Sequence, residues 1–143
     1  ESDVIFSERR RFYLEQIKAE ARKTGYTLTQ FGRRRYLPAL SSSLPFARAA
    51  AERMAMNAPL QGTAADIIKL AMIRAEAELV RRGLRLSAHL LLTVHDELLY
   101  EVAGERVAAV IPVLTQAMEE VIDWPIPLSV KVATGLNWAE LGV

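Results

Sequence analysis

The sequence contains no cysteine and only two histidines, His89 and His95, among its 143 residues. A structural zinc site takes its ligands from cysteine and histidine, so this composition excludes one in practice. The apolar runs are far shorter than the roughly 18 residues that cross a membrane, and no N-terminal stretch resembles a signal peptide. We therefore expect no membrane partner, and the lack of cysteine fits a cytoplasmic protein.

What is present is typical of one ordinary globular domain, with 51% hydrophobic and 24% charged residues. The net charge of +1 hides an asymmetry. Residues 1–53 carry 11 Lys and Arg against 6 Asp and Glu, whereas residues 54–143 carry 7 against 11. This division suggests a surface for a polyanion in the first part and a cation site in the second. Two ordinary mixed surfaces are the alternative.

Three consecutive ionisable residues, His95, Asp96 and Glu97, separate two short apolar runs at residues 90–94 and 98–102. Runs of this length and composition predict a tight β-hairpin with the three ionisable residues at its tip. Two like charges at one tip repel each other, and a bound divalent cation would offset the repulsion. A solvated acidic turn is the alternative.

The alternation of side chains along a strand divides the work between the two carboxylates. Asp96, at the turn, is the better direct metal ligand, and Glu97 would act from behind it or contact a second partner. His95 could bond to a phosphate or to the chain itself. An oxygen-only site suits Mg²⁺ or Mn²⁺.

A second pattern places Arg53, Asn57 and Gln61 four residues apart. On a helix they form a stripe about 12 Å long, at roughly 1.5 Å per residue. One cation and two amides could bind the sugar, base edge or phosphate of a nucleotide. A polar stripe that faces solvent is the alternative.

The remaining pattern predicts an α+β fold in which an antiparallel hairpin packs against long helices. A short hairpin carries Arg33, Arg34 and Arg35, which could contact phosphates or form a solvated turn. We expect Pro59 to bend the long central helix, and Thr63 with Asp66 to cap its restart. The predicted elements are helices at residues 7–23, 47–81 and 105–122, a hairpin at 26–30 and 33–37, a serine-rich loop at 40–45, and a last strand at 128–132.

The motifs closely resemble those of family A DNA polymerases, the DNA polymerase I type. The resemblance runs from Gly25 to the end of the chain, and the order and spacing of its parts are highly specific. The matching motifs are Ala51-Glu52-Arg53, Asn57-Ala-Pro59-Leu-Gln61-Gly62-Thr63-Ala-Ala-Asp66, Lys69, Val94-His95-Asp96-Glu97, Phe31-Gly32-Arg33-Arg34-Arg35-Tyr36-Leu37-Pro38, Pro127-Leu128 and Gly135-Leu136-Asn137-Trp138.

The resemblance implies template-directed nucleotidyl transfer from a dNTP to a primer 3′ hydroxyl, catalysed with two metal ions. It makes residues 1–46 the end of a fingers subdomain and residues 47–143 part of a palm. Asp96 would bind metal with help from Glu97, and His95 would lie close to the primer end. Arg53, Asn57 and Gln61 would line the minor groove of the primer–template DNA.

The family also has an upstream aspartate strand and a nucleotide-binding fingers helix, and nothing in this sequence matches either. With Glu1 in place of a starting methionine, we expect a C-terminal piece of a polymerase that needs the rest of the chain for activity. A DNA-binding or structural fragment without activity of its own is the main alternative. A histidine-aspartate metal phosphohydrolase is a weaker one, because it needs more histidines than this chain has.

Overall fold

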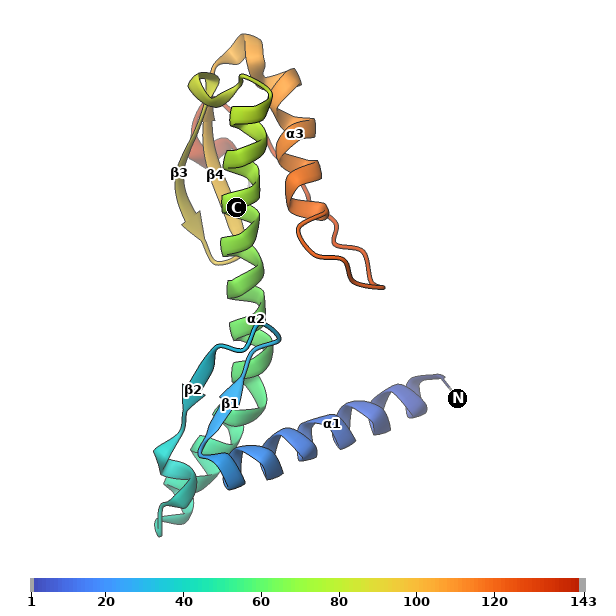
Figure 1. Cartoon of the computed structure of the whole chain (residues 1–143), viewed down its shortest axis with the longest axis vertical. Helices are drawn as coiled ribbons and strands as arrows, with labels where there is room; N and C mark the ends of the chain where they lie inside the picture. The colour runs from blue at the N-terminus through green and yellow to red at the C-terminus, as the bar shows by residue number, and fades with distance from the viewer. Residues whose placement is uncertain (1, 142–143) are drawn as a thin grey trace. The chain divides into compact units, whose positions relative to one another are not determined.

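The computed structural model describes the backbone of residues 2–141 and the side chains of residues 10–141. The chain divides into two compact units between Asp66 and Ile67. Helix α2 (Pro45–Arg81) contains the point of division. The mixture of helices with small antiparallel sheets confirms the predicted α+β class (Figure 1).

The first unit begins with helix α1 (Ser2–Thr24), which starts five residues earlier than predicted. The predicted short hairpin is confirmed as β1 (Tyr26–Leu28) paired with β2 (Arg34–Tyr36). Within the predicted serine-rich loop lies the end of a 3-10 turn, η1 (Pro38–Ser41). The hairpin lies along the first part of α2 (Figure 1).

Small side chains let the elements of the first unit approach closely. Gly25 ends α1 with a φ of +80°, a left-handed conformation that glycine adopts without strain. Arg22 of α1 and Glu52 of α2 form an ion pair of 2.6 Å at the same contact. The buried core consists of Ala21, Leu37, Leu40, Ala51 and Ala55.

Helix α2 is one uninterrupted helix, so the predicted restart after Pro59 is wrong. A proline inside a helix removes one backbone hydrogen bond but need not end the helix when tertiary packing holds both sides. Thr63 does not act as a cap, because its hydroxyl accepts a hydrogen bond of 3.0 Å from the backbone N–H of Gln30.

In the second unit, β3 (Ala88–Val94) pairs antiparallel with β4 (Glu97–Val102), which confirms the second predicted hairpin. Helix α3 (Val107–Glu119) is shorter than the 105–122 predicted and contains Pro112. Its buried residues are Val110, Val113 and Ala117. The core of the unit consists of Leu79, Leu84, Ala88, Val110 and Val113.

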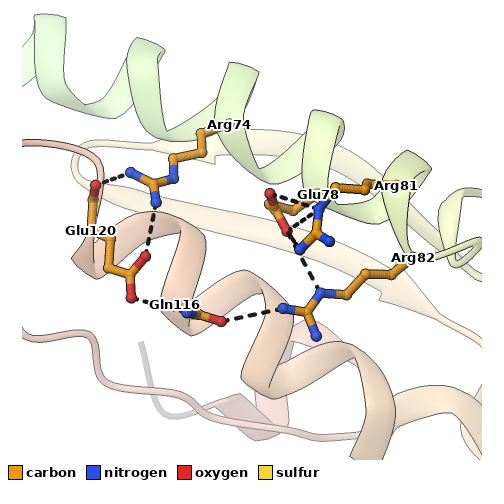
Figure 2. Close-up of polar contacts among 6 residues, drawn as sticks. All are labelled: Arg74, Glu78, Arg81, Arg82, Gln116 and Glu120. Atoms are coloured by element: carbon orange, nitrogen blue, oxygen red, sulfur yellow. Dashed lines mark hydrogen bonds and ion pairs between the residues drawn. The ribbon is translucent and has the colours of Figure 1, made fainter.

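Polar side chains bridge the end of α2 and helix α3 (Figure 2). Arg74 binds both the backbone carbonyl and the carboxylate of Glu120. Gln116 donates to the Glu120 carboxylate at 2.9 Å and accepts from Arg82. A hollow of about 140 Å³ lies among these side chains. Since its cations and carboxylates already pair with one another, we interpret this row as a structural contact between the helices.

Glu78 adds a second ion-pair cluster to the same row (Figure 2). Its carboxylate lies 2.6 Å from Arg81 and 3.6 Å from Arg82. The hydrogen bond from Arg81 lowers the pKa of the Glu78 carboxyl below its usual value. These pairs are exposed at least on the arginine side, so they define the orientation of side chains more than they stabilise the fold.

The predicted last strand at residues 128–132 is absent from the structure. A strand needs a partner to receive its backbone hydrogen bonds, and the two described sheets end at β2 and β4 without including this segment. This segment contacts α3 through a hydrogen bond of 3.0 Å from the Val130 N–H to the Glu119 carboxylate.

None of the helices in residues 2–141 combines the length and apolarity that a bilayer crossing requires.

Tyr100 of β4 offers a test of packing in the second unit. Its hydroxyl is buried and has no hydrogen-bond partner among the described residues. Burial, with a smaller contribution from Glu76, raises the pKa of Tyr100 above its ordinary value of 10.0. Tyr100→Phe removes this unbonded group, so we expect the free energy of unfolding to rise by about 1 kcal/mol.

The effect has a pH dependence of defined sign. Above pH 10 the tyrosine ionises first in the unfolded chain, since the folded pKa is the higher one, and the wild type therefore loses stability. Tyr100→Phe lacks this loss, so its advantage in urea denaturation should widen between pH 8 and alkaline pH. An equal advantage at both pH values would contradict the burial of this hydroxyl.

Candidate functional site

The tip of the β3–β4 hairpin carries the three ionisable residues together. Val94 pairs with Glu97, so His95 and Asp96 form the turn and Glu97 opens the second strand. His95 has a φ of +53°, in the left-handed region where histidine is found more often than most residues. A two-residue connection therefore forms here without glycine, and it exposes all three side chains to solvent.

The carboxylates of Asp96 and Glu97 face no cation among residues 10–141. None of the ion pairs or hydrogen bonds found among residues 10–141 involves the side chain of His95, Asp96 or Glu97. Asp96 belongs to the turn and Glu97 is the first residue of β4, so the alternation of side chains along a regular strand does not decide how these two carboxylates are oriented.

The carboxylates of the tip suit magnesium or manganese, but they are too few to fill the coordination positions of the ion. Carboxylate oxygens are the ligands that Mg²⁺ prefers, and it often takes only one or two from protein, with waters and phosphates filling the other positions. Within the described residues no group of three or more His, Asp or Glu side chains converges on one point. The tip can therefore hold an ion only together with ligands from outside the described part of this chain.

The stripe of Arg53, Asn57 and Gln61 lies on the part of α2 that belongs to the first unit. All three side chains are exposed, and none takes part in a hydrogen bond or ion pair of the described residues. Ala51, Ala55 and Ala58, on another face of the helix, are buried. The burial of that face leaves the stripe on the outside, with its donors available to a ligand.

The three consecutive arginines have three different environments. The guanidinium of Arg33 is bound to α2, through Asp66 at 2.8 Å and the carbonyl of Gly62 at 2.9 Å. Arg34 lies over the ring of Tyr26, 4.8 Å from its centroid. Arg35 approaches the sulfur of Met54 at 3.9 Å. All three remain exposed, but Arg33 is held by its own chain.

The contact of Arg33 with α2 is the feature that sequence reasoning missed. From the sequence, Asp66 is predicted to be part of a helix cap and Arg33 to contact a phosphate or to lie in a solvated turn. The available signal was weak: an acidic residue in a helix and an arginine in a turn, 33 positions apart. Spacing along the sequence cannot pair two such residues.

A family model described as DNA polymerase family A matches residues 8–140. The chain belongs to this family. The resemblance found in the motifs is thereby confirmed.

Two relatives are DNA polymerase I of Mycobacterium leprae, 49% identical over 129 residues, and the thermostable DNA polymerase I of Thermus aquaticus, 45% identical over 128 residues. Each match covers 90% of this chain. The chain spans only 14% of the first relative and 15% of the second.

Among solved structures, the chain is similar to the POL domain of Pol1 from M. smegmatis in complex with DNA primer-template and dNTP. The TM-score is 0.86 at 45% identity, over 93% of this chain and 23% of that one. A family A polymerase domain is therefore the structural setting of both the hairpin tip and the stripe.

Proposed function

We propose that this chain is a C-terminal portion of a DNA-directed DNA polymerase that transfers nucleotides from dNTPs to a primer 3′ end. The proposal rests on family membership together with one observation, the exposed hairpin tip whose two carboxylates have no cation partner in the described chain. In this proposal residues 1–46 complete a fingers subdomain and residues 47–143 form part of the palm. The enzyme would serve DNA replication and repair in the cytoplasm, where its substrates are.

In the proposed site the hairpin tip presents oxygen ligands to the reacting phosphates. Asp96 would hold a divalent ion directly, and Glu97 would support it from the neighbouring position. His95, the first turn residue, would lie close to the primer end. Bound Mg²⁺ or Mn²⁺ would lower the pKa of the 3′ hydroxyl and stabilise the charge that develops on the transferred phosphate. The missing ligands would come from elsewhere in the polymerase.

The stripe would bind the primer–template from the minor-groove side. Every base pair presents hydrogen-bond acceptors there at similar positions. The guanidinium of Arg53 and the amides of Asn57 and Gln61 can donate to these acceptors. Donors in this arrangement test the geometry of a base pair without reading its sequence. Arg34 and Arg35, which are both exposed, would contact backbone phosphates. Arg33 could contact a phosphate only by giving up its hydrogen bonds to α2.

Primer extension tests the proposal. A complete polymerase that carries this segment should extend a primer when Mg²⁺ and dNTPs are supplied. The 143-residue chain alone should not, because one metal-binding segment cannot hold two ions in the required geometry. Binding of primer–template by the chain without extension is the result expected for a fragment that contributes DNA contacts only. Extension by the isolated chain above background would contradict the proposal that the metal ligands are divided between this chain and the rest of the polymerase.

A further inference from the structure

The turn that joins β1 to β2 is hydrogen-bonded to helix α2 at residues that follow Gln61, and the first of them is Gly62. Three hydrogen bonds form the attachment, and all lie in the first unit. The N–H of Gln30 donates to the Thr63 hydroxyl at 3.0 Å, while Arg33 donates to the Gly62 carbonyl at 2.9 Å and to the Asp66 carboxylate at 2.8 Å. We call this set of bonds the turn contact.

The turn contact lies beside two residues of α2 that are unfavourable in a helix. Pro59 cannot donate the backbone hydrogen bond that an ordinary residue in its position would make, and Gly62 is a poor helix former. Gln61 lies between these two residues. Arg53 precedes both of them.

The fit at Gly62 leaves no room for a side chain. A Cβ built on Gly62 would lie 2.6 Å from the Cγ2 methyl of Thr29 and 3.5 Å from Arg33 Nη2. The methyl cannot rotate away cheaply, because the Thr29 hydroxyl accepts hydrogen bonds from the N–H groups of Phe31 and Arg33 at 3.3 and 3.2 Å. The hairpin turn thus lies directly against the backbone of α2.

We propose that the turn contact positions Gln61 for its minor-groove contact, with Arg33, Thr29 and Gly62 as positioning residues. This inference rests on the proposed function, since it assumes that Gln61 donates to a base. It also gives Arg33 a task other than binding phosphate. The Arg33 guanidinium already donates from Nε to the Asp66 carboxylate and from Nη2 to the Gly62 carbonyl, which leaves fewer of its five N–H groups for a phosphate.

The test uses the complete polymerase and two primer–templates that differ in one purine near the primer end. In the first, the purine has its normal N3 atom. In the second, N3 is replaced by C–H (3-deaza). Where Gln61 donates to that N3, the wild type should lose about 10-fold in kcat/KM on the 3-deaza substrate. Gln61→Ala should extend both substrates equally, because the donor is gone. The comparison of two enzymes on two substrates isolates one hydrogen bond. A general loss of stability or of DNA affinity affects both substrates equally, so it does not change the ratio of their kcat/KM values.

Gly62→Ala should behave as Gln61→Ala does, losing most of its sensitivity to the deaza substitution, since small displacements break a directional hydrogen bond. Thr29→Ser keeps the hydroxyl and removes the methyl that blocks a Cβ. It should be close to wild type alone, and in combination with Gly62→Ala it should restore the sensitivity.

Arg33→Lys covers the case in which Gly62→Ala fails to fold. Lysine retains the charge but cannot reach both acceptors with a planar fork. We expect it to lose the deaza sensitivity with little change in the salt dependence of DNA binding. Retained sensitivity in Arg33→Lys, or in Gly62→Ala, would overturn the positioning role while leaving the proposed function intact. If Gln61→Ala itself remains sensitive at every position tested, the minor-groove assignment fails, and this inference fails with it.

Discussion

Replacing Asp96 with alanine in a complete polymerase that carries this segment should reduce kcat for primer extension by about 10³-fold or more. The loss corresponds to about 4 kcal/mol of transition-state stabilisation, at roughly 1.4 kcal/mol for each factor of ten. The reason is that the tip supplies a ligand that waters cannot replace in the same position. Single-turnover incorporation of one dNTP, with DNA saturating, measures the chemical step.

Two variants of the same hairpin make this result specific. Glu101→Ala removes an exposed carboxylate from β4, opposite His89 and away from the tip, and should leave kcat within about two-fold of wild type. Glu97→Gln should cost less than Asp96→Ala, because we place Glu97 behind the direct ligand. Normal incorporation by Asp96→Ala would remove the tip from the active site, and an equal loss in Glu101→Ala would indicate damage to the hairpin instead.

Arg53→Ala should have the second largest effect, lowering kcat/KM for the next nucleotide by about 10- to 100-fold. Arg53 brings the only full charge of the stripe, and hydrogen bonds from a charged donor are worth about 1.5–3 kcal/mol. The side chain is exposed and bonds to nothing in the described chain, so its removal should not destabilise the fold. Steady-state extension with correct dNTPs gives kcat/KM, and thermal unfolding verifies that the protein is intact.

Arg48→Ala is the matched control for Arg53. It removes an exposed arginine from the same helix, five residues earlier and on another face, where its guanidinium donates one long hydrogen bond of 3.4 Å to the Ser42 carbonyl. Its loss should be within about three-fold and should follow ionic strength, as expected for a cation that acts only through charge. If the two variants lose equal activity with equal salt dependence, Arg53 acts as a general cation, and the minor-groove assignment of the stripe is wrong.

Local sequence determined most of the candidate functional features of this protein. The hairpin at residues 88–102 follows from two short runs of β-forming residues joined by a two-residue turn, which are interactions between close neighbours. The outward stripe of Arg53, Asn57 and Gln61 follows from the helical period together with the alanines on another face of α2. The order and spacing of the same motifs also indicate the polymerase family.

Only the tertiary structure decided which distant residues meet. It attached Arg33 to Asp66 and Gly62, where the sequence had offered a phosphate contact and a helix cap. It also left residues 128–132 without strand pairing, although their composition favours a strand. The physical reason is common to both cases. Helical faces and tight turns depend on residues close in sequence, whereas an ion pair across 33 positions or a strand partner depends on how the whole chain packs.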